Sequence, residues 1–254
     1  IHDCEPPMSI ALQGGWGSGR TSLMNMLRGT GDLEQSGLLD VNRCKVVSLD
    51  SWAYTQFNHD DYVVMSCLLT IGNQLGEALK DSPDVKLSEL QTLVEKARNQ
   101  LADVTRQLTE LKQGRLDGNP PGESYLDISG KMLEFRDAFR QLVGLWVRSG
   151  HDRRVVVFVD DLDRIPPAKT VELLEAMKNF MDVPGIVFVL ALDYDVVQRG
   201  ITRKFGVETQ KTSGKAFFDK MIQVPFVVPA PSYDLDKYII DLFHKAGLQC
   251  VQGE

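Results

Sequence analysis

A glycine-rich stretch near the start of the chain has the residue types and spacing best suited to chemistry. Its residues are Gly14-Gly15-Trp16-Gly17-Ser18-Gly19-Arg20-Thr21, which fit the phosphate-binding pattern G-x-x-x-x-G-K-S/T at every fixed position except the lysine. A strand-like run at residues 9–13 precedes it and a helical pattern at residues 23–27 follows, so backbone amides and a helix N-terminus would face a phosphate. We predict that this stretch and Ser22 bind a nucleotide, with the Thr21 hydroxyl on Mg²⁺ and Ser22 near the α-phosphate.

A pair of acids, Asp160 and Asp161, ends the apolar run of residues 154–159. Phosphoryl transfer needs a carboxylate that organises Mg²⁺ and a group that polarises the attacking water. We predict that Asp160 holds the magnesium and that Asp161 polarises the water. Two adjacent acids at a strand end are otherwise typical of an exposed turn, and the phosphate-binding pattern upstream is what favours the catalytic interpretation.

Arg20 stands at the lysine position of the phosphate-binding pattern. Lysine meets the β- and γ-phosphates as a compact point charge, whereas arginine is bulkier, forked and able to bind through two nitrogens. The substitution therefore keeps the charge and changes the geometry. We assign Arg20 to phosphate binding and catalysis, and expect nucleotide binding to tolerate the change better than turnover does.

Alternating strand and helix patterns predict the scaffold around these residues. The strand-like runs cover residues 44–49, 154–159, 186–192 and 222–227, and the helical patterns cover residues 63–75, 169–181 and 234–246. Since two of these strands end in acids and helices separate them, we predict an α/β fold with a mostly parallel sheet and helices on both faces.

Residues 87–111 have the strongest periodicity in the chain. Apolar side chains recur there at alternating spacings of three and four, at Leu87, Leu90, Val94, Ala97, Leu101, Val104, Leu108 and Leu111. Such a helix, about 40 Å long, is too long for a small domain to bury along its whole length. We expect a helical hairpin with the apolar stretch 132–146, reversed at the Gly- and Pro-rich residues 114–122. Self-association and a foreign partner helix also fit the same apolar seam.

These patterns divide the chain into parts. We expect the first part of a nucleotide-binding core at residues 1–80, a helical insertion at 81–150, the second part of the core at 151–230, and the start of a C-terminal helical region at 231–254. The chain begins at Ile1 rather than Met and stops just after a helical pattern. We therefore interpret it as part of a longer protein.

Composition limits the function classes. The 28 Lys and Arg against 35 Asp and Glu give a formal charge of −7, so nucleic-acid binding would need a local basic patch. The four cysteines are far apart and no histidine has zinc-ligand spacing, which indicates reduced thiols. No apolar run reaches the roughly 18 residues that span a bilayer, and no signal peptide opens the chain. We expect no membrane segment in this portion and a cytoplasmic location.

Four stretches together resemble the KAP family of P-loop NTPases, a branch close to the STAND and AAA-like ATPases. They are Gly15-Trp16-Gly17-Ser18-Gly19 with Thr21-Ser22, Val157-Phe158-Val159-Asp160-Asp161-Leu162-Asp163-Arg164, Val187-Phe188-Val189-Leu190-Ala191-Leu192-Asp193, and Lys220-Met221-Ile222-Gln223-Val224-Pro225-Phe226. The resemblance implies an ATPase core that uses ATP and Mg²⁺, within larger proteins that include bacterial phage-exclusion and defence proteins and animal membrane scaffolds. Members often carry transmembrane helices between the two nucleotide motifs, where this chain has its heptad helix.

The resemblance also suggests roles, with alternatives, for three further residues. Asp193 stands where related ATPases place a polar sensor, or it caps the helix after it. Arg164 is a finger for a neighbouring subunit's phosphate, or it pairs with Asp161 or Asp163 of its own chain. Trp16 lies over the nucleotide, or it packs against the domain surface.

These features favour Mg²⁺-dependent ATP hydrolysis that drives conformational change or assembly, with a homo-oligomer or an effector protein as partner. The resemblance implies a role in anti-phage defence. Arg20 favours a rival, a non-hydrolysing nucleotide switch or scaffold whose heptad helix recruits a partner. A nucleic-acid motor is a third interpretation, which the charge of −7 disfavours.

Overall fold

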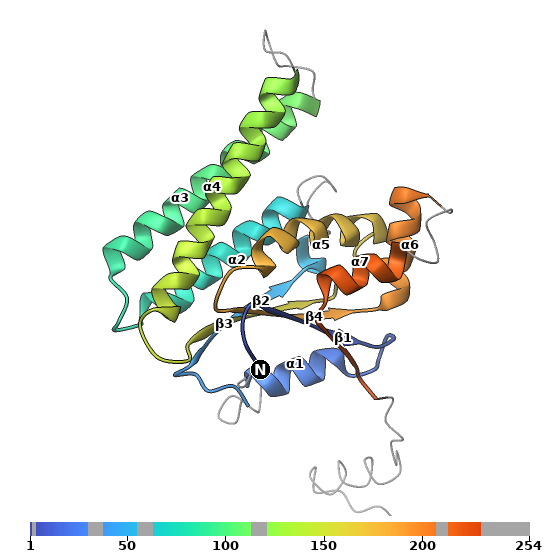
Figure 1. Cartoon of the computed structure of the whole chain (residues 1–254), viewed down its shortest axis with the longest axis horizontal. Coiled ribbons are helices and arrows are strands. Elements are labelled where there is room, and N and C mark those ends of the chain that lie inside the picture. Colours follow the sequence, from blue (N-terminus) through green and yellow to red (C-terminus); the bar gives the residue numbers. More distant parts are fainter. Residues whose placement is uncertain (2–3, 30–37, 55–62, 113–120, 207–212, 230–254) are drawn as a thin grey trace, which may run out of the picture.

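A sheet of parallel strands forms the centre of the molecule (Figure 1). The computed structural model describes residues 1, 4–29, 38–54, 63–112, 121–206 and 213–229. The five strands lie in the order β2-β3-β4-β1-β5. Their bounds are Met8–Gln13 for β1, Cys44–Asp50 for β2, Arg154–Asp160 for β3, Ile186–Leu192 for β4 and Val224–Val227 for β5. The predicted α/β fold with a parallel sheet is confirmed.

The central strands β3 and β4 are apolar on both faces, because helices cover each side of a parallel sheet. Along β3, Val155, Val157 and Val159 belong to the larger core cluster, whereas Val156 and Phe158 belong to the cluster on the opposite face. All five are at most 1% exposed. Continuous apolar runs, rather than alternating ones, therefore marked these strands in the sequence.

Helices cover both faces of the sheet, as predicted, but unequally (Figure 1). Helix α1 lies on one face, where Met24 packs with Leu12 and Val189. The other face carries several helices, and a single turn of 3-10 helix, η2, follows β2. The bounds are Arg20–Arg28 for α1, Trp52–Tyr54 for η2, Val63–Lys80 for α2, Pro167–Met181 for α5, Tyr194–Phe205 for α6 and Ser213–Met221 for α7.

The start of the last strand differs from the sequence prediction, and one helix was not predicted. The last strand begins at Val224 rather than at residue 222, because the Ile222 N–H donates to the Phe218 carbonyl oxygen at 2.9 Å and so extends the turn of α7. Helix α7 itself was not predicted. The helix predicted at residues 234–246, and the C-terminal region that contains it, lie outside the described residues.

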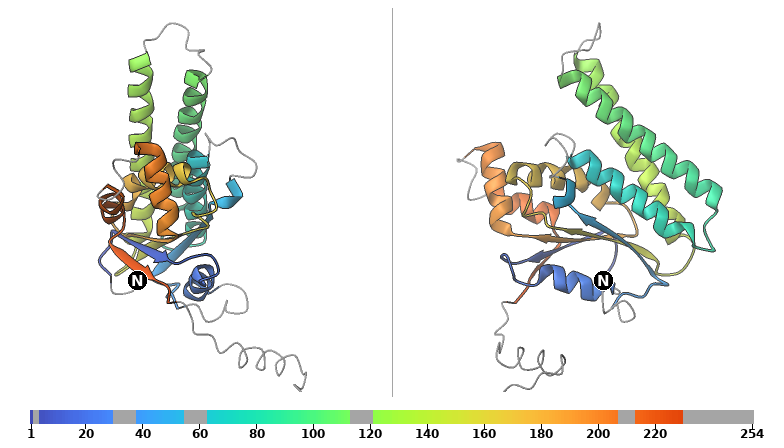
Figure 2. Two further views of the ribbon diagram at one scale, coloured as in Figure 1. Left: turned by 90° about the vertical axis from the view of Figure 1, so that its right-hand side faces the viewer. Right: turned by 180° about the vertical axis from the view of Figure 1, so that it is seen from behind.

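A helical hairpin projects from the body of the molecule (Figure 2). It consists of α3, Leu87–Lys112, and α4, Pro121–Val147. Its seam buries Leu90, Ala97, Leu101 and Val104 of the predicted heptad positions, whereas Leu87 is 48% exposed. The predicted intramolecular hairpin is thus confirmed over the described residues; its predicted reversal falls largely outside them.

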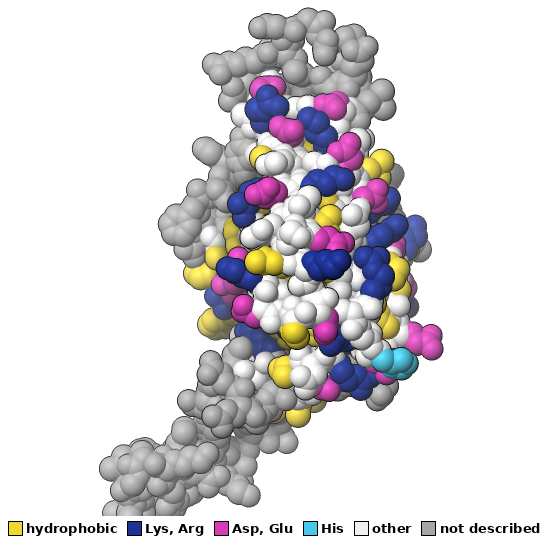
Figure 3. Space-filling view, turned by 90° about the vertical axis from the view of Figure 1, so that its left-hand side faces the viewer, with side chains coloured by type: hydrophobic (Ala, Val, Ile, Leu, Met, Phe, Trp, Pro, Cys, Tyr) yellow, Lys and Arg dark blue, Asp and Glu magenta, His cyan; other side chains and the backbone are white. Residues whose placement is uncertain are grey.

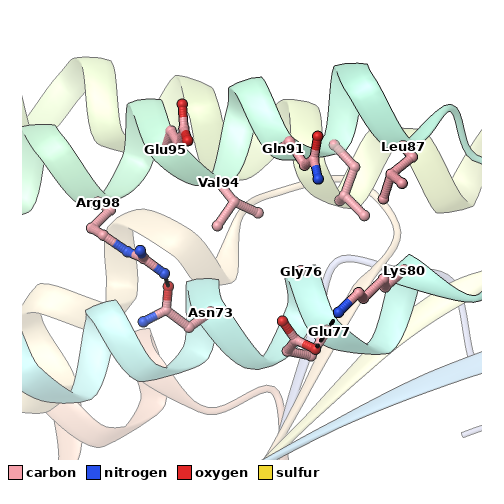
Figure 4. Close-up of a pocket in the computed structure, with 10 residues that line it drawn as sticks. Asn73, Gly76, Glu77, Lys80, Leu87, Gln91, Val94, Glu95 and Arg98 are labelled. Atoms are coloured by element: carbon pink, nitrogen blue, oxygen red, sulfur yellow. Dashed lines mark hydrogen bonds and ion pairs between the residues drawn. The ribbon is translucent and has the colours of Figure 1, made fainter.

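The base of the hairpin packs on α2 across a groove of about 370 Å³ (Figure 4). Arg98 of α3 donates to the Asn73 Oδ1 of α2 at 3.3 Å across this groove. A Cβ on Gly76 would overlap the side chain of Val94, so glycine sets the distance at which the two helices meet.

The described residues also test the predictions about membrane-spanning segments and cysteines. Among the helices that the structure describes, none combines the length and the apolarity needed to cross a bilayer. The cysteines at positions 4, 44 and 67 are free thiols. Burial raises the pKa of Cys67 to about 12, so this thiol is unreactive at neutral pH.

Candidate functional site

The phosphate loop runs from Gly14 to Gly19, between the end of β1 and the start of α1. Gly17, with φ of 80°, and Gly19, with φ of 90°, adopt the left-handed conformation that other residues rarely take. The Ser18 N–H donates to the Gly15 carbonyl oxygen at 3.2 Å, which tightens the turn. Gly19 is the N-cap of α1, so the loop leads directly into the positive end of a helix dipole.

An open hollow of about 290 Å³ brings this loop together with the acidic end of β3. Its lining consists of Trp16, Gly17, Ser18, Gly19, Arg20, Thr21, Ser22, Asp161 and Arg164. Strands β1 and β3 both pair with β4, and parallel strands deliver their carboxyl ends to one edge of a sheet. Sheet topology therefore unites predicted residues from two distant segments. Gly14, Gly15, Asp160 and Asp193 are outside the lining.

Asp160 is the last residue of β3, as predicted, and hydrogen bonds fix it firmly. Its carbonyl oxygen accepts from the Ser51 N–H at 3.2 Å and from the Ser51 Oγ–H at 2.7 Å. Its carboxylate Oδ1 accepts from the Asp161 N–H at 2.8 Å, which leaves Oδ2 as the oxygen for a ligand.

The donor set suits magnesium. The Asp160 carboxylate and the exposed Thr21 hydroxyl are hard oxygen donors, and Mg²⁺ is commonly held by one or two carboxylates together with phosphates and water. No cage of three or more His, Cys, Asp or Glu exists among the described side chains. Because Asp160 and Thr21 supply only two ligands, they fit an ion that takes the rest of its coordination from a bound nucleotide and water.

Asp161 combines an unusual backbone with a perturbed carboxyl group. Its φ of 57° is left-handed, a conformation that is uncommon outside glycine and that clusters at functional sites. Burial and the neighbouring charge of Asp160 raise the pKa of Asp161 above its ordinary value, while the cation of Arg164 opposes the rise. A carboxylate of raised pKa is a stronger base than a fully solvated one.

Arg164 pairs with Asp161 of its own chain, which confirms one of the two roles considered for it. The Nε of Arg164 donates to the Asp161 Oδ1 at 2.8 Å, and the guanidinium lies 5.2 Å from the ring centre of Trp52. These two contacts hold the side chain at the rim of the hollow. The role as a finger for a neighbouring subunit stays a prediction.

Arg20 is buried, and its guanidinium contacts an acid rather than open solvent. Its Nη2 donates to the Asp163 Oδ2 at 2.6 Å, and the two side chains are 9% and 10% exposed. Its Nη1 is buried without a hydrogen-bond partner. Arg20 therefore lines the hollow while carrying a counter-ion that the sequence prediction did not give it.

The surroundings of Asp193 and Trp16 distinguish between the alternatives considered for each residue. Asp193 caps α6, since its Oδ1 accepts from the Asp195 N–H at 2.9 Å, so the capping alternative is confirmed; its role as a sensor stays a prediction. Trp16 is 85% exposed, so the expectation that it packs against the domain surface is wrong. The tip of a tight glycine loop holds its side chain away from the sheet, which leaves the nucleotide as its predicted contact.

The sequence named Asp163 only as a possible partner of Arg164 and gave no role to Asp50. Asp163 pairs with Arg20, and its place two residues after Asp161 was the available signal. Asp50 ends β2 opposite Asp160 in the strand register, and its charge adds to the rise in the pKa of Asp161. Recognising Asp50 required the pairing of β2 with β3, which the sequence pattern did not supply.

Known proteins place this arrangement in a family. Over 85 residues the chain is 27% identical to the phage T7 exclusion protein of Escherichia coli (strain K12), a match that covers 33% of this chain and 11% of that protein. The chain thus corresponds to a small part of this relative's length. Residues 1–242 match the KAP family P-loop domain, which covers nearly the whole chain. With the phosphate loop, the acidic strand end and the parallel sheet in place, the chain belongs to the KAP family of P-loop NTPases.

Proposed function

We propose that this domain binds ATP with Mg²⁺ and hydrolyses it. The observation that carries the proposal is the single hollow lined by both the phosphate loop and Asp161, since phosphoryl transfer needs a phosphate cradle and a water-polarising group within one site. Membership of a P-loop NTPase family supports nucleotide binding. The choice of ATP over other nucleotides rests on the family resemblance.

In this proposal the amides of the loop and the N-terminus of α1 hold the phosphate oxygens. Thr21 and Asp160 supply ligands for Mg²⁺, which when bound neutralises charge on the phosphates. Asp161 accepts a proton from the attacking water as its oxygen adds to the terminal phosphorus, and the bond to the bridging oxygen breaks. The ion pair with Arg164 orients the Asp161 carboxylate for this step.

We further propose that this activity powers or gates a conformational change or an assembly step in a larger protein. The projecting hairpin of α3 and α4 is the surface that we assign to a second copy of the chain or to an effector protein, because it extends beyond the nucleotide-binding core (Figure 2). The name of the matched relative, a phage exclusion protein, supports a role in anti-phage defence.

A nucleotide-dependent scaffold without turnover is the second candidate function. The observation that favours it is the 2.6 Å contact between Arg20 and Asp163, which occupies the cation that would otherwise be directed wholly at the phosphates. In that case nucleotide binding selects one conformation and no phosphate is released.

Steady-state phosphate release from Mg-ATP tests the proposal. We expect the wild-type protein to release phosphate, and Asp161→Asn to lower the rate at least about a hundredfold while it still binds ATP, because general-base groups contribute that much. Asp152→Asn is the matched control, since Asp152 has a similar φ of 55° against 57° for Asp161 but lies outside the lining of the hollow. Binding without release in every variant would favour the scaffold.

A further inference from the structure

The pair of Arg20 and Asp163 is the feature of the site that the proposed function leaves unexplained. Arg20 is the first residue of α1, directly after the phosphate loop, and Asp163 lies in the turn after β3. Both side chains are about nine-tenths buried. A buried charge is costly unless an opposite charge compensates it. Asp163 is thus the present counter-ion of the cation that the phosphate loop would offer to a nucleotide.

The planar, forked guanidinium of arginine suits this arrangement. The guanidinium carries two terminal nitrogens in a fixed plane, whereas the ammonium of lysine is a single point. In this chain Nη2 contacts Asp163 and Nη1 is buried without a partner, so the guanidinium is only partly satisfied. Because Nη1 has almost no exposed area, an anion in the hollow reaches it only if the guanidinium turns.

The acid also sets the charge that an incoming phosphate meets. With Asp163 ionised, the pair contributes no net charge to the hollow, and the one acid of the lining, Asp161, is paired with Arg164. Loss of the Asp163 charge would leave a buried guanidinium whose nearest available counter-ion is the ligand. The attraction between a guanidinium and a phosphate in contact grows as the surroundings become less polar than water.

We propose that Asp163 is an intramolecular counter-ion with which a bound phosphate competes for Arg20, so that the strength of this pair sets the affinity for nucleotide. Asp163 acts through Arg20 and is a positioning residue. The proposal rests on the proposed function, since it assumes that the hollow takes a nucleoside triphosphate. It also accounts for arginine at the lysine position, because the fork can pass from carboxylate to phosphate without losing all its hydrogen bonds.

A double-mutant cycle on the full chain tests the competition. Equilibrium titration with Mg-ATP, and separately with inorganic triphosphate, is made on wild type, Asp163→Asn, Arg20→Met and the double variant. We expect Asp163→Asn to bind at least about tenfold more tightly than wild type, and the gain to fall below about threefold in the Arg20→Met background, a coupling of ordinary size for contacting residues. Asp163→Ser replaces Asp163→Asn if the latter does not fold.

A matched control isolates the pair from a general change in charge. Asp84→Asn removes one carboxylate from an ion pair, with Arg153 at 2.8 Å, whose acid is 44% exposed and lies outside the hollow. We expect it to bind Mg-ATP like wild type. In the absence of ligand, Asp163→Asn should unfold at a lower temperature than Asp84→Asn, because it leaves a buried charge without its partner.

The outcomes separate this proposal from the proposed function. If wild type binds Mg-ATP and Asp163→Asn binds no more tightly, the competition is wrong while nucleotide binding stands. Suppose that Asp163→Asn raises the affinity for Mg-ATP equally with Arg20 present and with Arg20→Met. The removal of a negative charge would then explain the gain without Arg20, and the competition would be wrong. If neither wild type nor Asp163→Asn binds nucleotide or triphosphate, the proposed function is wrong and the competition falls with it.

Discussion

At the scale of single residues, Asp161 carries the features expected of a catalytic group. It adopts a left-handed backbone conformation, and burial and the charge of Asp160 raise its pKa. The left-handed backbone conformation costs stability as local strain. The raised pKa costs stability because the folded state holds an ionised carboxylate where burial and the charge of Asp160 disfavour it. A residue kept under such conditions is explained better by chemistry than by folding.

This cost can be measured as a change in stability with pH. Since the pKa of Asp161 is raised in the folded state, ionisation of this carboxyl costs stability, and the cost grows as the pH rises from the ordinary pKa of an aspartate to the raised one. We expect Asp161→Asn to increase the free energy of unfolding at pH 7 by about 0.5–1 kcal/mol, as removal of functional strain often does. The gain should shrink as the pH falls from the raised pKa of Asp161 to the ordinary pKa of an aspartate, because below both values the carboxyl is neutral in the folded and the unfolded states.

Urea unfolding across this pH range, with Asp152→Asn as control, checks the prediction. The control shares the left-handed backbone, with φ of 55°, and its exposed side chain pairs with Arg43 at the surface. A loss of stability in Asp161→Asn at pH 7, or a gain that does not depend on pH, would contradict the assignment.

Much of the site was predictable because its signals are local in sequence. The glycine positions of the loop follow from the left-handed turns that they allow, and Asp160 and Asp161 follow from the end of an apolar strand. The contact of Arg20 with Asp163 was not predictable, since it depends on the direction of a long side chain between two segments that only the sheet brings together.

At the scale of elements, the hairpin shows what a heptad pattern does and does not specify. The spacing predicted an apolar seam on one long helix, and α4 supplies the partner face within the same chain. An aromatic cluster then anchors α4 to the body, where the ring of Phe180 in α5 lies 5.2 Å from that of Phe135 and 5.4 Å from that of Phe139. Helices α1 and α7 each have nine residues, too few for a clear period; the glycine loop indicated α1, whereas no motif precedes α7.

The hairpin seam predicts unequal costs for two leucines of the same pattern. Leu101 is 1% exposed and Leu87 is 48% exposed. We expect Leu101→Ala to lower the free energy of unfolding by about 2–4 kcal/mol, through lost burial and the cavity left behind, and Leu87→Ala by less than about 1 kcal/mol. Chemical denaturation of both variants provides the measurement.

Equal losses of stability in the two leucine variants would contradict this description of the seam. They would mean that Leu87 is buried in solution, as it would be if the heptad face associated with a second helix. The same pair of variants therefore also tests the self-association that the sequence left open.

At the scale of the whole molecule, the order of the strands creates the site. The order β2-β3-β4-β1-β5 places β4 between the strand of the phosphate loop and the strand of the acids, and all their carboxyl ends meet at one edge. The sequence predicted the strands and their parallel direction, but not this order, because hydrophobic patterns identify strands without specifying their neighbours.

The chain has a formal net charge of −7. On the face seen in Figure 3, acidic and basic side chains are intermixed, and no broad basic patch gathers there. A sequence-independent grip on nucleic acid would need such a patch. This face therefore gives no support to the nucleic-acid motor considered from the sequence.

Equilibrium binding of Mg-ATP to two glycine variants tests most directly whether the glycine loop binds the phosphates of ATP. Gly19 and Gly206 have nearly equal φ values, 90° and 89°, and a Cβ at either would meet no atom within 4 Å. Alanine is strained at both positions, and more so at Gly206, whose ψ of 169° lies in a region that only glycine readily adopts, against a ψ of 15° at Gly19. Only Gly19→Ala also turns the amides of the phosphate loop.

We predict that wild type and Gly206→Ala bind Mg-ATP alike and that Gly19→Ala binds at least about tenfold more weakly, because the amides that cradle the phosphates are displaced. Equal binding by all three proteins, or no binding by wild type, would contradict the claim that this loop holds a nucleotide.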